Sequence, residues 1–166
     1  LLSPTAAPLV KGKLVCEGRT LENAVVEVQS LQNKVEKKQD VSYAQSNENG
    51  GYEMPFRNTE KVAISASKKG YISEVVISSE PAEASKNIEM TKLEKGNRFT
   101  LKNILFERSK ASFLPISIPE LENLKNVLLT NPKLIILIEG HTDSNGKTMQ
   151  ASVAEKLQKL SKERAD

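Results

Sequence analysis

A polar loop near the end of the chain holds the residues best suited to chemistry. Residues 139–146 read EGHTDSNG and follow a continuous apolar run. The loop contains the chain's single histidine, His141, beside Thr142 and the carboxylate of Asp143. Loops at the carboxyl ends of buried strands commonly hold ligands, so this composition favours a binding site. A polar turn without a ligand is the alternative, because Asp, Ser and Asn favour turns in any case.

The chemistry open to this loop is binding rather than catalysis. A zinc site needs several His or Cys ligands, whereas His141 has no second histidine to join it. We expect its imidazole to be hydrogen-bonded inside the loop. His141 and Asp143 lie too close along the chain to serve easily as base and orienting acid for a distant serine. Glu107 and Asp143 could form an acid–base pair, but nothing favours this over ligand binding. We therefore expect no enzyme, no metal and no cofactor.

A second stretch, residues 160–165, reads LSKERA. Taken alone, it predicts an ordinary helical segment with a solvated charged face. It contributes a leucine, Leu160, and an arginine, Arg164, whose planar guanidinium suits a carboxylate ligand.

The composition excludes several classes of protein. The chain has 166 residues, of which 38% are hydrophobic and 27% charged, so it can build a core. Its 24 basic and 21 acidic residues are mixed, which argues against a nucleic-acid-binding surface. No apolar run is long enough to span a bilayer. The chain begins with Leu1 rather than Met, so we expect it to be a piece of a longer protein.

The lone cysteine, Cys16, cannot form an intrachain disulfide. We expect it to be a small buried hydrophobic residue on a strand, with a reactive thiol as the alternative. Lipid attachment is not expected, because the bulky Val15 precedes it where a small residue is usual.

The first half of the chain predicts an all-β sandwich. Residues 1–8 are a proline-containing linker, and short runs separated by turn signals then follow to residue 94. Strong turns are predicted at residues 47–51 and 69–71. The predicted strands are 10–16, 24–30, 52–56, 62–67, 71–77 and 87–93.

The second half predicts an α+β domain, 98–166, joined by a linker at 95–97. Pro119 suits the first turn of a helix in which leucines recur, and Asn131-Pro132 ends it. The apolar run 134–138 (LIILI) predicts a buried central strand. With a strand at 99–106 and a helix at 149–165, the fold class is a two-domain chain: an all-β sandwich followed by an α+β β-α-β core.

The second half resembles the OmpA C-terminal family. The resemblance rests on Phe106-Glu107, the leucine-rich helix, Asn131-Pro132, the apolar run, residues 140–146 (GHTDSNG) and residues 160–165. It covers roughly residues 97–166 and implies non-covalent binding of the peptide stem of peptidoglycan. The later helix and strands of that family are missing from this sequence.

The resemblance also implies residue roles. The matching aspartate, Asp143, would bind the amino group of diaminopimelate, and the matching arginine, Arg164, one of its carboxylates. Thr142 would support the bound peptide, and Glu107, His141 and Leu160 would also line the site.

Three features depart from the family pattern. Glu107 stands where aspartate is usual, Leu157 where asparagine is usual, and Arg164 lies 21 positions after Asp143, a longer spacing than we expect. A structural or protein-interaction module of an envelope secretion complex, with a degenerate peptidoglycan site, is therefore the alternative function.

The first half resembles the carboxypeptidase regulatory-like family, a transthyretin-type sandwich. The residues that carry this are 12–15, 21–26, 49–52 and 69–71. This order of domains is similar to the C-terminal part of Bacteroidetes envelope proteins, including components of the type IX secretion system. It implies a periplasmic location at the outer membrane of a Gram-negative bacterium, with peptidoglycan and possible secretion-complex proteins as partners and no nucleic acid.

Overall fold

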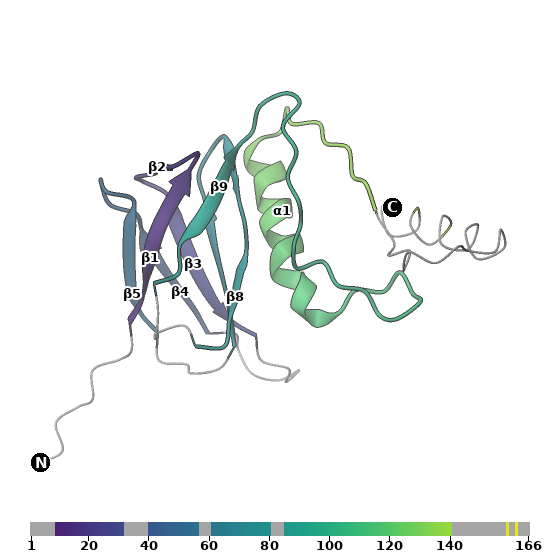
Figure 1. Ribbon diagram of the computed structural model, residues 1–166, viewed down its shortest axis with the longest axis horizontal. Coiled ribbons are helices and arrows are strands. Elements are labelled where there is room, and N and C mark those ends of the chain that lie inside the picture. Colours follow the sequence, from purple (N-terminus) through teal and green to yellow (C-terminus); the bar gives the residue numbers. More distant parts are fainter. Residues whose placement is uncertain are drawn as a thin grey trace, which may run out of the picture.

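The structure is a computed structural model. It describes residues 9–31, 40–56, 61–80 and 85–140, together with Lys159 and Lys162. Within these residues, two β-sheets face one another and one α-helix, α1, stands beside them (Figure 1).

The first sheet has the strand order β2-β1-β9-β7, and β5 pairs with the other part of β1. Strand β1 pairs antiparallel with β5 from Leu9 to Lys13 and parallel with β9 at Leu14 and Val15. The strands are β1 (Leu9–Cys16), β2 (Arg19–Thr20), β5 (Gly51–Pro55), β7 (Tyr71–Ser73) and β9 (Ile88–Lys92).

The second sheet has the order β4-β3-β6-β8, and all its pairs are antiparallel. Strand β3 lies at the centre, between β4 and β6. The strands are β3 (Val25–Ser30), β4 (Val41–Gln45), β6 (Val62–Ser67) and β8 (Val76–Ser78).

The core lies between the two sheets. Side chains alternate across each strand, so every second residue of β1 points inward and is buried. Leu14 from the first sheet and Val26 and Ile64 from the second are completely buried in one apolar cluster. Cys16 belongs to the same cluster and is 8% exposed, which confirms its prediction as a buried hydrophobic residue.

The predicted single strand at 71–77 is two strands in different sheets. Strand β7 pairs with β9, whereas β8 pairs with β6. The chain therefore crosses from one sheet to the other at Glu74 and Val75. The buried Ser73 hydroxyl accepts a hydrogen bond from the Ala66 amide at 3.0 Å, which ties the crossing point to β6.

A 3₁₀ turn, η1 (Pro115–Ser117), leads into α1 (Ile118–Thr130). The helix begins and ends where the sequence predicts, with Pro119 in its first turn and Asn131 as its C-cap. It contacts β6 and β7, one strand from each sheet. Among the described residues, no helix is long and apolar enough to cross a membrane.

The predicted fold class is wrong. Within the described residues the chain is mostly β, with two sheets and one short helix, and no OmpA-like α+β core is present. The predicted strand at 99–106 is absent apart from a single bridge between Phe106 and Phe113. The predicted central strand at 134–138 forms no strand with any other described residues. The helix packs against the sandwich instead of against strands of its own.

Part of the second half lies outside the described residues. Within the predicted helix at 149–165, only Lys159 and Lys162 are described, and both are helical.

Candidate functional site

Most of the predicted peptidoglycan site lies outside the described residues. His141, Thr142, Asp143, Leu160 and Arg164 belong to this undescribed part, so the structure neither brings them together nor separates them. Two parts of the prediction lie within the described residues: the segment that precedes the loop in the sequence, and the turn that carries Glu107.

The segment leading into the loop is exposed rather than buried. Ile135 is 94% exposed and Leu137 is 86% exposed, whereas Ile136 and Ile138 are 39% and 49% exposed. The segment runs away from the end of α1 as an extended trace (Figure 1). The prediction that residues 134–138 are buried under a helix is therefore wrong, although their extended course agrees with it.

Glu107 lies on an exposed turn that is closed by the Phe106–Phe113 bridge. The Glu107 amide donates to the Ser112 carbonyl at 2.8 Å, and the two phenylalanine rings stack at 4.9 Å. The Glu107 carboxylate accepts a hydrogen bond from Lys110 Nζ at 2.5 Å. An exposed ion pair of this kind contributes little stability, so the carboxylate can exchange partners with a ligand at small cost.

A buried polar cluster under α1 was not predicted from the sequence. Glu120 is only 1% exposed, and its Oε2 accepts hydrogen bonds from the Asn103 side chain at 2.6 Å and the Asn103 amide at 3.2 Å. Asn103 also donates to the Val75 carbonyl at 2.7 Å. On the next turn of the helix, Asn123 donates to the Ser73 carbonyl at 2.8 Å. These bonds attach α1 and the segment before it to the crossing point of the sandwich.

The charge of Glu120 is poorly compensated. Its other oxygen, Oε1, has no hydrogen-bond partner in the part of the chain that the structure describes. Burial raises the pKa of the Glu120 carboxyl, and its bonds from Asn103 only partly oppose this. An acidic residue directly after a proline in the first helical turn normally signals a solvated helix start. No feature of the sequence marks Glu120 as buried.

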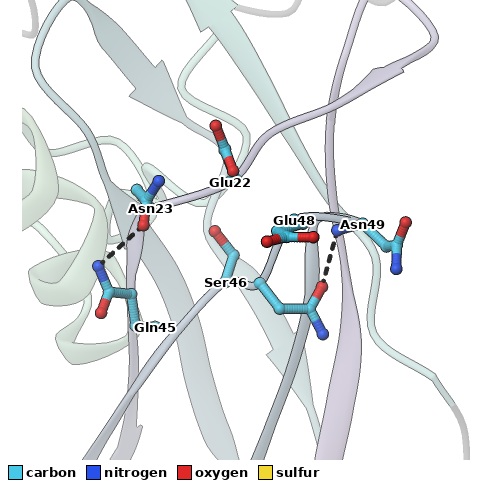
Figure 2. A pocket seen from close by; sticks show the side chains of 7 residues that line it. Glu22, Asn23, Gln45, Ser46, Glu48 and Asn49 are labelled. Atoms are coloured by element: carbon cyan, nitrogen blue, oxygen red, sulfur yellow. Dashed lines mark hydrogen bonds between the residues drawn. The ribbon is translucent and has the colours of Figure 1, made fainter.

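A polar hollow lies where the turn between β4 and β5 meets the chain entering β3 (Figure 2). Its side chains form the turn itself. Asn47 Oδ1 accepts from the amides of Asn49 and Gly51 at 3.0 and 2.9 Å, and Gln45 reaches Asn23 at 3.4 Å. The hollow is lined by Glu22, Asn23, Gln45, Ser46, Asn47, Glu48 and Asn49.

These contacts indicate a structural role for the hollow. The Ser46 hydroxyl accepts from the Ala24 amide at 3.0 Å, so it too is used to hold the turn against β3. Across residues 9–31, 40–56, 61–80 and 85–140, no group of three His, Cys, Asp or Glu residues is arranged to hold a metal ion.

Comparisons with models of protein families, with curated proteins and with solved structures found no match to this chain.

Proposed function

We propose that the chain binds peptidoglycan non-covalently, through the diaminopimelate of its peptide stem. One observation carries the proposal: the loop motif Gly140-His141-Thr142-Asp143 is followed by the helical motif at 160–165, as in the OmpA C-terminal family. In this role the chain would anchor a periplasmic or outer-membrane assembly to the cell wall.

The ligand chemistry supports the pairing of Asp143 with Arg164. The free end of diaminopimelate carries both an ammonium and a carboxylate, so a complementary site needs one fixed anion and one fixed cation. Asp143 supplies the anion, and the guanidinium of Arg164 offers a bidentate fork to the carboxylate.

The chain that precedes the loop is exposed to solvent. Residues 135–139, which lead into the loop, are all exposed, and the Glu107 side chain is 42% exposed. Peptidoglycan is a polymeric network, and exposed chain next to the motif is compatible with a ligand of that size.

A pull-down with purified peptidoglycan sacculi tests the proposal. Wild type is expected to sediment with the sacculi, whereas Asp143→Asn is expected to stay in the supernatant. Loss of one partner of a desolvated ion pair costs roughly 2–5 kcal/mol. Asp166→Asn makes the same charge change outside the motif and is expected to sediment like wild type. Wild type that remains in the supernatant would overturn the proposal.

A second candidate is a protein-interaction module of an envelope secretion complex. The exposed apolar side chains of residues 135–138 favour it, because large exposed apolar patches mark interaction sites. The sedimentation test distinguishes the two functions. An interaction module would not sediment with sacculi, and Asp143→Asn would not change its sedimentation.

A further inference from the structure

Residues 133–139 (KLIILIE) carry an apolar run that leaves the turn at Pro132 and Lys133 as extended chain over residues 134–139, with no β-partner in the part of the chain that the structure describes (Figure 1). Within the described residues, its one hydrogen bond between backbone groups runs from the Leu134 amide to the Asn131 carbonyl, at 2.8 Å. It presents backbone donors and acceptors beside five consecutive large apolar side chains. Exposed extended chain of this kind is a template for pairing with another strand.

The exposure of the segment alternates from residue to residue. Ile135 and Leu137 are 94% and 86% exposed, whereas Ile136 and Ile138 are 39% and 49% exposed. A period of two is the pattern of a β-strand with one face toward the protein and one toward solvent. The segment therefore has the extended course and the alternating exposure of an edge strand, with Ile136 and Ile138 on its less exposed face.

The charges at the two ends of the segment favour antiparallel pairing with a second copy of the chain. Lys133 precedes the five apolar residues and Glu139 follows them. If two copies pair antiparallel about Ile136, Lys133 of each copy lies opposite Glu139 of the other. A parallel, in-register pair would instead oppose Lys133 to Lys133 and Glu139 to Glu139, which is destabilising.

The same antiparallel register matches the apolar side chains. Ile136 lies opposite itself at the two-fold axis, and Ile135 lies opposite Leu137 of the other copy. On that face each of these two side chains covers part of the apolar surface of its neighbour. A shift of two residues would break both charge pairs and place either Lys133 opposite Leu137 or Glu139 opposite Ile135, so the register centred on Ile136 is the complementary one.

We propose that residues 133–139 are a self-complementary strand through which two copies of this chain form an antiparallel, two-fold dimer. The interface is isologous, as expected for a closed dimer. A two-stranded ribbon is marginally stable alone, so the dimer is reversible and concentration-dependent. The proposal does not depend on peptidoglycan binding.

Sedimentation velocity of the full chain and its charge-reversal variants tests the proposal. Wild type is expected to form dimers as its concentration rises. Lys133→Glu and Glu139→Lys each replace two attractive pairs by two repulsive pairs, so each is expected to dimerise roughly tenfold more weakly. All of these side chains lie on an exposed segment, so the variants are expected to fold like wild type.

Restoration of the charge pairs is the matched control. The double variant Lys133→Glu/Glu139→Lys is expected to dimerise like wild type. An equimolar mixture of the two single variants is expected to form a heterodimer, because each glutamate then faces a lysine. A monomeric wild type, or single variants that dimerise as well as wild type, would overturn the proposal.

Disulfide cross-linking tests the register itself. In a Cys16→Ala background, Ile136→Cys places two thiols opposite one another at the axis, so oxidation is expected to give a covalent dimer. Leu134→Cys is the control, because its two copies would lie about 14 Å apart along the ribbon, beyond the reach of a disulfide. Equal cross-linking of both variants would contradict this register.

A monomeric wild type that binds phosphatidylcholine vesicles would assign the segment to a lipid surface instead and overturn the dimer.

Discussion

Cys16 shows at the scale of one residue how burial controls reactivity. Burial raises the pKa of the thiol, and the neighbouring Glu17 charge adds to this. Because the thiolate is the nucleophile, we expect the folded chain to react with an aromatic disulfide reagent only slowly at neutral pH. In 6 M urea we expect rapid reaction of one thiol per chain. Rapid modification of the folded chain would contradict the burial of Cys16.

Gly12 on β1 has no room for a side chain. A Cβ at this position would lie 1.9 Å from the Lys86 carbonyl oxygen, and that oxygen is held by a 2.5 Å hydrogen bond from the Tyr52 hydroxyl. We expect Gly12→Ala to lower the free energy of unfolding by about 1–3 kcal/mol or more, measured by urea denaturation.

Gly51 is the matched control for this substitution. It lies on the partner strand β5, and a Cβ there would meet only the Asn47 side chain, at 3.3 Å. Gly51→Ala is therefore expected to cost less than Gly12→Ala. Equal losses would show that the close approach of Lys86 to β1 does not matter.

At the residue scale, the sequence identified the polar loop and could not identify the buried cluster. The types and order of His141, Thr142 and Asp143 can be read directly from the sequence. The burial of Glu120 depends instead on Asn103, 17 positions earlier, and on the crossing point of two sheets. No local pattern encodes such a contact.

At the scale of elements, the strands with one inward face were predictable. Short runs between turn signals, with alternation of apolar and polar residues at 24–30 and 62–67, predicted β1, β3, β5, β6 and β9 close to their observed bounds. Strand β4 was not predicted because its residues are exposed or half-buried, so its sequence carries little alternation of hydrophobicity.

The predictions of strands at 99–106 and 134–138 were wrong for a common reason. A strand needs a partner for its backbone groups, and the sequence does not show whether one is present. In the predicted strand at 99–106, the Asn103 and Leu105 amides are bound by the side chains of Glu120 and Ser117. These bonds take the place of a β-ladder.

Helix α1 provides a prediction about pH. Glu120 has a raised carboxyl pKa in the folded chain, so the folded state binds this proton more tightly than the unfolded state does. Its contribution to stability is therefore most favourable at low pH and is lost as the pH rises through the folded pKa. We expect Glu120→Gln to be at least as stable as wild type at pH 7, because glutamine keeps an acceptor for Asn103 without a buried charge.

Urea denaturation at two pH values checks this expectation. The advantage of Glu120→Gln is expected to shrink toward pH 4, where wild-type Glu120 is also neutral. Glu53→Gln, at an exposed position of β5, is the control and is expected to show no such trend. A Glu120→Gln variant that is less stable at pH 7 than at pH 4, relative to wild type, would refute this account of the charge.

At the scale of the whole molecule, the fold class was wrong although most of the elements were right. The described residues put one helix against a two-sheet sandwich, where we expected two domains. Helix α1 buries Glu120, Asn123 and Val127, and its leucines are half-buried or exposed. The recurring leucines thus predicted the helix itself, but the residues that it buries are mainly others.

Without the expected second domain, apolar surface of the described residues stays uncovered. Leu129 at the end of α1 is 69% exposed, and the apolar run at 133–139 follows directly. Dimerisation through that run would cover part of this surface. It would also carry two copies of the loop at 140–146, one at each end of the antiparallel ribbon.

The most direct test of the central claim is a binding cycle between Arg164 and the diaminopimelate carboxylate. Calorimetry would compare wild type and Arg164→Ala, each with a stem peptide containing diaminopimelate and with the same peptide containing lysine, which lacks that carboxylate. We expect tight binding only for wild type with diaminopimelate, and weakening by roughly 2–5 kcal/mol when either partner is removed. Removing both is expected to cost little more than removing one. Equal binding of the two peptides by wild type, or no binding of either, would contradict the claim.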